Sequence, residues 1–417
     1  MNRVLLIGNG FDLAHGLKTS YASFIDWYWK EWGRRLLHGL NMVEKDGLCS
    51  FSLHQNLNVG MWARVWGLLI KRPDLRIPWD EKEIAEIAKS NRELCEFSIT
   101  SPLLEELCKQ LKDRKWVDIE NVYFKHLNNE FEKPEKVNNE LSVIRSGLIN
   151  YLKEIQDAIP DNMINEDIRK KMIAPFKERD IAIGSKELWK SMLQQRVNYS
   201  NEVWAEMISL CSNQDRVYVE YNRVESFLRD YSGRIKSDGI ENVDKNNIPW
   251  GFLLPDRVML LNFNYTNIAD SYLPDVKRCN VNHIHGELTN PESVIFGYGD
   301  EIDENYKKIS NKNDNEYLKN MKSINYLESP NYRNLLDFIE SDTYQIFIMG
   351  HSCGNSDRTL LNTLFEHKNC VSIKPFYHKW DDGSDNYMEL VQNISRSFTD
   401  MKLMRDRVVN KTFCEAF

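Results

Sequence analysis

The chain has 417 residues, 42% of them hydrophobic and 28% charged, with a formal net charge of −8 at pH 7. This balance excludes an intrinsically disordered chain, and the length allows two hydrophobic cores. The negative charge argues against broad binding to nucleic acid or membrane surfaces, and no run of about 18 apolar residues predicts a membrane span.

The N-terminus enters a strand without a charged leader, and the eight cysteines form no C-x-x-C pair. We therefore expect a cytoplasmic protein with reduced thiols and no structural zinc.

The first predicted element is a strand that ends at a turn with two glycines. The apolar run 4–7 is followed by Gly8-Asn9-Gly10 and by a helix start at Phe11-Asp12-Leu13. A strand, a glycine turn and a helix hold nucleotide phosphates in α/β folds, because the backbone can approach the ligand and the helix N-terminus offers N–H groups. The turn is not G-x-G-x-x-G, so the dehydrogenase fingerprint does not apply. Asp12 suits either a ligand contact or a helix N-terminal charge, and His15 is expected on the helix surface.

The next stretch, residues 22–250, has helical patterning. Leu141, Ile144, Leu148 and Leu152 share one helical face, and ten of the eleven tryptophans lie in this stretch. So many large aromatic residues indicate a separate core. We predict an inserted α-helical domain over 22–255, with residues 1–21 and 256–417 forming the other domain.

Short apolar runs return after residue 255 and predict strands. They lie at 258–264, 281–285, 294–296, 344–349 and 371–376. Runs of this kind are typical of a buried, mostly parallel sheet. The predicted fold class is therefore α/β, a Rossmann-like, mostly parallel sheet with a large α-helical insertion. A final helix is expected over 381–401.

Polar clusters stand at the C-terminal ends of four predicted strands, which is where open α/β sheets bind ligands. The clusters are residues 8–12, 261–267, 283–286 and 350–354, the last followed by Asp357. Alternation along a strand would place His283 and His285 on one face, but no third ligand stands nearby, so we expect no metal.

These motifs carry a resemblance to a known family. LLIGNGFDLAHGL, LNFNYTN, HIHG, FGYG and MGHSCGNSD resemble the bacteriophage abortive-infection AbiH family, and the segment Trp116-Val117-Asp118-Ile119-Glu120 fits it as well. The resemblance implies a function in phage defence.

The motif order also resembles the sirtuin-like superfamily of NAD-binding domains, with its G-A-G-x-S turn, T-x-N-Y-D, H-G and late G-x-S. In this resemblance Gly8 and Gly10 match the phosphate-turn glycines. Asn264 matches the asparagine that contacts the nicotinamide ribose, and His285 matches the catalytic histidine. The resemblance thus implies NAD as substrate, with Asn264 and His285 as catalytic residues.

Several positions depart from the superfamily pattern. Asn9 replaces alanine, Asp12 replaces serine and Thr266 replaces aspartate, while Gly350 and Ser352 match the late adenosine-side turn. The four-cysteine zinc module of sirtuin deacylases is absent from the sequence, which favours NAD cleavage over protein deacylation. The implied nucleotide contacts comprise Gly8, Asn9, Gly10, Phe11, Asp12, Thr19, Gly350, Ser352 and Asp357.

Other interpretations stay open from the sequence. Ser352 and Asp357 fit helix caps as well as ligand contacts, and Cys353 fits a buried thiol. The pocket could bind NAD, ADP-ribose or a related nucleotide as a signal without turnover. Asp12, Asp118, Glu120 and the histidines could instead form a metal-dependent phosphoesterase or nuclease. A phage-derived trigger or partner and a homo-oligomer are also left open.

Overall fold

The computed structural model describes residues 1–38, 43–54, 81–90, 92, 95–114, 118–160, 163–198, 253–272 and 279–417. It divides into two compact units. The sheet unit comprises Met1–Gly16, Ile159–Val294 and Tyr326–Phe417, and the helical unit comprises Leu17–Ala158 and Ile295–Asn325. Trp116 and Val117 of the family-like segment lie outside the described residues.

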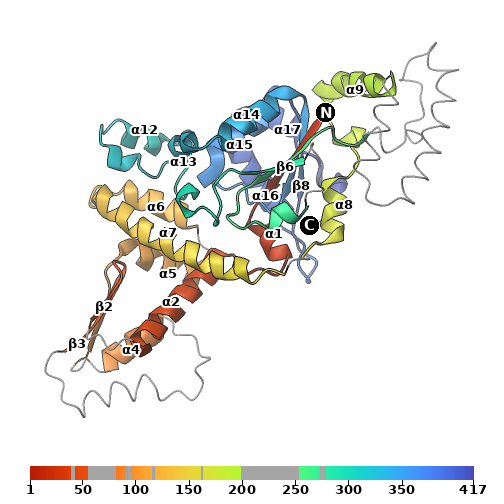
Figure 1. The fold of residues 1–417 in the computed structure, drawn as a ribbon. Coiled ribbons are helices and arrows are strands. Elements are labelled where there is room, and N and C mark those ends of the chain that lie inside the picture. Colours follow the sequence, from red (N-terminus) through yellow and green to blue (C-terminus); the bar gives the residue numbers. More distant parts are fainter. Residues whose placement is uncertain are drawn as a thin grey trace. The chain divides into compact units, whose positions relative to one another are not determined.

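The sheet unit is built on a five-stranded sheet in the order β6-β5-β1-β7-β8, labelled in part in Figure 1. All four neighbouring pairs are parallel, which confirms the predicted fold class. The strands are β1 (Asn2–Ile7), β5 (Val258–Asn262), β6 (Cys279–His283), β7 (Tyr344–Met349) and β8 (Cys370–Phe376). Except in β6, every strand residue is buried, as continuous apolar runs require.

Helices cover this sheet. The α-helices are α1 (Asn9–Ala14), α8 (Glu166–Met172), α9 (Lys186–Asn198), α14 (Asn331–Ser341), α15 (Arg358–Glu366), α16 (Tyr387–Arg396) and α17 (Met401–Arg407). The 3-10 turns are η1 (Glu178–Asp180), η2 (Ile183–Ser185), η6 (Ile268–Tyr272), η7 (Pro291–Ser293), η9 (Tyr326–Glu328), η10 (Asn355–Asp357) and η11 (Lys411–Phe413). α14 packs on β6, and α15, α16 and α17 pack on β8.

β1 is the central strand of the sheet, and the order of the strands reverses at it. The chain fills one side of β1 with β5 and β6, and then crosses to the other side for β7 and β8. Because the strands are parallel, the polar residues that follow β1, β5, β6 and β7 meet at one edge of the sheet. A reversal of strand order of this kind is where open α/β sheets bind ligands.

The helical unit consists mainly of α-helices. They are α2 (Tyr21–His38), α4 (Glu81–Ser90), α5 (Pro102–Arg114), α6 (Ile119–Leu127), α7 (Pro134–Asp157), α12 (Glu304–Ser310) and α13 (Lys322–Asn325), with the 3-10 turn η8 (Asn315–Tyr317). The predicted face of α7 is buried at Leu141, Ile144, Leu148 and Leu152. Among the described residues, no helix is both long and apolar enough to cross a bilayer.

Three secondary-structure elements differ from the prediction. An antiparallel sheet of β2 (Val43–Lys45), β3 (Cys49–Leu53) and β4 (Cys95–Ile99) lies in the stretch predicted to be helical. Residues 294–296 form no strand; they are buried in an irregular segment, and Phe296 packs on the ring of Tyr21. The last helical region is two helices, α16 and α17.

The bounds of the two compact units differ from those of the predicted domains. Residues 159–198 belong to the sheet unit and residues 295–325 to the helical unit, whereas the sequence predicts an insert over 22–255.

Candidate functional site

The two glycine turns of the site pack directly against each other. The Gly10 amide donates to the Gly350 carbonyl oxygen at 2.8 Å. Gly350 has φ of 80°, and a Cβ added to it would lie 2.1 Å from the backbone nitrogen of Phe11. Only glycine fits there. The amides of Gly8 and Phe11 also donate, to the carbonyls of Met349 and Gly8, so these turn amides serve the junction of β1 and β7.

Phe11 and His15 lie in the core of the sheet unit. The Phe11 ring has no exposed surface and packs against the rings of His15, Tyr272 and Phe417. The His15 ring is hydrogen-bonded through Nδ1 to the Phe11 carbonyl and through Nε2 to the Tyr272 hydroxyl. The expectation that His15 lies on the helix surface is therefore wrong. Burial lowers the pKa of His15, although its bond to the Phe11 carbonyl partly opposes this.

Asp12 is buried beneath the loop that carries Asn264. Its Oδ1 accepts from Asn264 Nδ2 at 2.7 Å, and its Oδ2 accepts from the Thr266 hydroxyl at 2.7 Å. Asn264 Nδ2 also donates to the Gly8 carbonyl at 3.0 Å. Both amide hydrogens of Asn264 are thus directed to the protein. The acceptor Oδ1 is the atom that this half-buried side chain has to offer a ligand.

Asn262, the last residue of β5, shapes the same loop. Its Oδ1 accepts from the backbone N–H of Asn264 at 3.0 Å, and its Nδ2 donates to the Thr266 carbonyl at 3.0 Å. Its Nδ2 also lies 3.3 Å from Nδ1 of His283, whose Nε2 contacts Asp270. Because β6 ends at His283, His285 stands in the following turn and the two histidines do not share a strand face.

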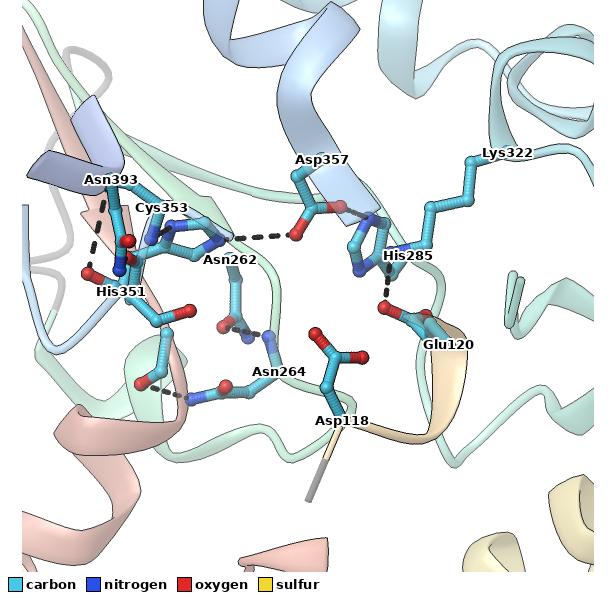
Figure 2. Close-up of polar contacts among 12 residues, drawn as sticks. Asp118, Glu120, Asn262, Asn264, His285, Lys322, His351, Cys353, Asp357 and Asn393 are labelled. Atoms are coloured by element: carbon cyan, nitrogen blue, oxygen red, sulfur yellow. Dashed lines mark hydrogen bonds and ion pairs between the residues drawn. The ribbon is translucent and has the colours of Figure 1, made fainter. Parts of the chain in front are cut away.

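Asp357 joins two buried histidines, as Figure 2 shows. Its Oδ1 lies 3.2 Å from Nε2 of His285, and its Oδ2 lies 3.5 Å from Nε2 of His351. Asp357 makes no side-chain hydrogen bond to cap α15, so the capping interpretation fails. A carboxylate only accepts hydrogen bonds, which places a proton on each facing Nε2.

Asp357 faces Nε2 in both rings, so the chemistry open to each histidine depends on its Nδ1. Nδ1 of His351 accepts from the Cys353 backbone N–H at 3.0 Å, so both ring nitrogens of His351 are engaged. Nε2 of His285 faces Asp357 Oδ1, and in the tautomer that donates to this carboxylate the ring lone pair lies on Nδ1. This is the pattern of a general base that is oriented by a carboxylate through its other nitrogen.

The turn after β7 also holds Ser352 and Cys353. Burial raises the pKa of the Cys353 thiol far above its ordinary value, and the nearby charge of Asp357 adds to this. The thiol is therefore protonated at neutral pH and is no nucleophile. Ser352 is exposed, and its carbonyl accepts from Asn393 Nδ2 at 2.9 Å; Asn9 is exposed as well.

A comparison with protein families decides what this chain is. The family model described as Bacteriophage abortive infection AbiH matches residues 4–378. The chain belongs to the AbiH family. Family membership supports an anti-phage abortive-infection role. Neither the curated proteins nor the solved structures contain a significant match to the chain.

The remaining candidate residues of this AbiH protein lie in the helical unit. Thr19 is buried. Asp118 caps α6 by accepting from the Asn121 backbone N–H at 3.0 Å. Glu120 forms a buried ion pair with Lys322 at 2.9 Å. The contacts of Asp118 and Glu120 therefore include structural ones within the helical unit.

Sequence reasoning did not assign roles to three residues of this AbiH site. His351 lies within the MGHSCG motif, so its position at a strand end was the available signal. In the sequence, Thr266 stands out only as a departure from the superfamily pattern. Tyr326, whose hydroxyl lies 3.1 Å from Nε2 of His285, lies outside every motif. No local pattern could have indicated it.

Proposed function

We propose that this AbiH protein is an NAD+ hydrolase that cleaves the nicotinamide–ribose bond. The observation that carries the proposal is the His285–Asp357 pair beside Asn264, at the carboxyl edge of the parallel sheet (Figure 2). The motif resemblance to NAD-binding sirtuin-like domains supplies the substrate class. The substrate NAD+ and its phosphate contacts are part of the proposal, and the glycine turns alone do not support them.

The proposed reaction is a hydrolysis with an oxocarbenium-like transition state, similar to that of glycosidases. The bond between ribose C1′ and the nicotinamide nitrogen breaks, and its electron pair leaves with neutral nicotinamide. A water oxygen bonds to C1′, and the water proton passes to Nδ1 of His285. The products are nicotinamide, ADP-ribose and one proton, which His285 releases to solvent.

Asn264 has a defined part in this scheme. Its Oδ1 accepts a hydrogen bond from the attacking water or from a ribose hydroxyl, while Asp12 and Gly8 hold its Nδ2. Because the side chain is fixed by two hydrogen bonds before substrate binds, it needs little reorganisation during the reaction. Asp357 orients His285 and stabilises the imidazolium that forms.

The proposal explains abortive infection in chemical terms. Cleavage of NAD+ removes the main hydride carrier of the cell, so an activity that is released by infection would halt the host before phage particles mature.

The test is nicotinamide release by the purified protein, with and without lysate from phage-infected cells. We expect release by the wild type and a loss of about 10²-fold or more in H285A, the range for removal of a general base. H378A, at an exposed histidine, is the matched control and should retain full activity. Far-UV circular dichroism of each variant checks that it is folded.

Two results would contradict the proposal. One is no nicotinamide release under any condition, together with intact phage defence in H285A. The other is tight NAD+ or ADP-ribose binding by calorimetry without turnover, which would favour the nucleotide-sensing alternative.

A further inference from the structure

Tyr326 contacts the imidazole of His285 in a way that no motif predicts. It is 5% exposed and begins η9. Its hydroxyl lies 3.1 Å from Nε2 of His285, the nitrogen that also faces Asp357. The two rings are nearly parallel, with an interplanar angle of 8° and centroids 6.1 Å apart. Tyr332 stacks on Tyr326 at 5.4 Å and 4°.

We infer that Tyr326 is the positioning residue that holds the His285 ring in the orientation needed for proton transfer. The inference rests on the proposed function for its catalytic consequence, but the orientation itself can be measured without turnover. Tyr326 touches His285 and acts through it, so its role differs from that of a residue in contact with substrate.

The physical argument concerns rotation of the imidazole ring. The contact between Asp357 Oδ1 and Nε2 at 3.2 Å defines one direction for the ring and does not by itself fix the tilt of the ring about that direction. The Tyr326 hydroxyl gives the same Nε2–H a second acceptor. Two acceptors on different sides of the N–H restrict both the direction of the bond and the tilt of the ring. Phe263 meets the ring edge-on at 5.2 Å and limits tilting from another direction.

Orientation matters because a general base acts only within hydrogen-bond reach of the proton it takes. A misplacement of about 1 Å in a catalytic group can cost about 10²-fold in rate. Groups that face His285 include Asp357, Tyr326, Phe263 and Tyr265, and the Tyr326 hydroxyl lies within hydrogen-bond distance of the imidazole at 3.1 Å.

The test compares Y326F, which keeps the ring and removes the hydroxyl, with Y332F, which removes a hydroxyl from the outer ring of the same stack. In Y326F we expect kcat for nicotinamide release to fall about 10-fold with KM for NAD+ unchanged. The acid limb of its pH profile should move to lower pH by about half a unit to one unit, because the lost acceptor stabilised the protonated ring. Y332F should have the kcat and pH profile of the wild type.

Y326L loses both the hydroxyl and the ring stacking, so its kcat for nicotinamide release should fall further than that of Y326F.

A second readout separates this inference from the proposed function. Nitrogen NMR of protein labelled at its nine histidines, with His285 assigned through H285Q, reports the tautomer and titration of the ring. A shift of the His285 signals in Y326F but not in Y332F supports the positioning role even if no NAD+ is cleaved. Unchanged His285 signals in folded Y326F would overturn it, whatever the activity.

Discussion

Asp12 holds two side chains of the β5 loop through its two carboxylate oxygens, Asn264 through one and Thr266 through the other. Asp12 and Thr266 are also two of the positions at which the chain departs from the sirtuin-like motifs. These departures therefore contact each other, as a hydroxyl donor and a carboxylate acceptor. The pair sets the orientation of Asn264, and with it the direction of the Asn264 Oδ1 acceptor.

Replacement of Thr266 tests this arrangement. T266V keeps the volume and removes the hydroxyl donor from buried Asp12, so we expect a loss of about 1–3 kcal/mol in the free energy of unfolding and slower nicotinamide release. T266S keeps the donor and serves as the control. Denaturant unfolding and the release assay check both variants. Equal release rates in the two variants would show that the Thr266–Asp12 bond does not orient Asn264.

His15 makes stability depend on pH. Burial lowers its pKa below the ordinary value of 6.5 in the folded protein, so the unfolded chain binds the proton more readily. The stabilisation by neutral His15 is complete above about pH 6.5 and is lost as the pH falls below that value. Denaturant unfolding at pH 7.5 and 5.5 should show a smaller pH dependence in H15Q than in the wild type, while H378Q should keep the wild-type dependence.

The location of the site was predictable in part. Asn264, His285 and Asp357 follow three different strands, and the shared edge of a parallel sheet brings such residues together. Their partners were not predictable, because Asp12 and Asn264 are separated by 252 positions and their bond depends on side-chain rotamers. His285 was placed on a strand, but the strand ends at His283 and a turn carries His285.

At the scale of elements, the turns after β1 and β7 form one structural junction. The Gly10–Gly350 contact joins them, and His351, whose Nε2 faces Asp357, follows Gly350 directly in the chain. The glycines are therefore required for packing whether or not a phosphate binds there.

Gly350 and Gly383 provide a matched test of this packing. Both have positive φ, 80° and 85°, but a Cβ on Gly350 would meet Phe11 whereas Gly383 has nothing within 4 Å. We expect G383A to cost roughly 1 kcal/mol and G350A more than about 3 kcal/mol, because only the latter adds a clash to the backbone strain. Denaturant unfolding measures both costs. Equal costs would show that the junction adjusts without strain.

The central strands were predictable because their apolar runs are continuous and bounded by turns. The strand prediction at 344–349 is confirmed residue for residue by β7. The antiparallel sheet was missed, although Cys49, Phe51 and Leu53 alternate with serines on β3 and a similar alternation marks β4. Period-two patterns this short are easily obscured by the helical patterning around them.

At the scale of the whole molecule, AbiH family membership accounts for the phage-defence role, and the polar edge of the sheet unit provides a candidate centre for its chemistry. The helical unit has its own buried polar contacts, of which the Glu120–Lys322 ion pair is one. In the proposed function, NAD+ cleavage at the site of the sheet unit is the reaction that produces the abortive-infection response.

The measurement that tests this claim most directly is a metabolite profile of phage-infected cells that express the wild type or N264A at equal levels. We predict that NAD+ falls while nicotinamide and ADP-ribose rise in cells with the wild type, and that N264A keeps NAD+ at the level of uninfected cells and fails to block the phage. Equal NAD+ levels in both strains, with phage growth blocked in both, would contradict the account.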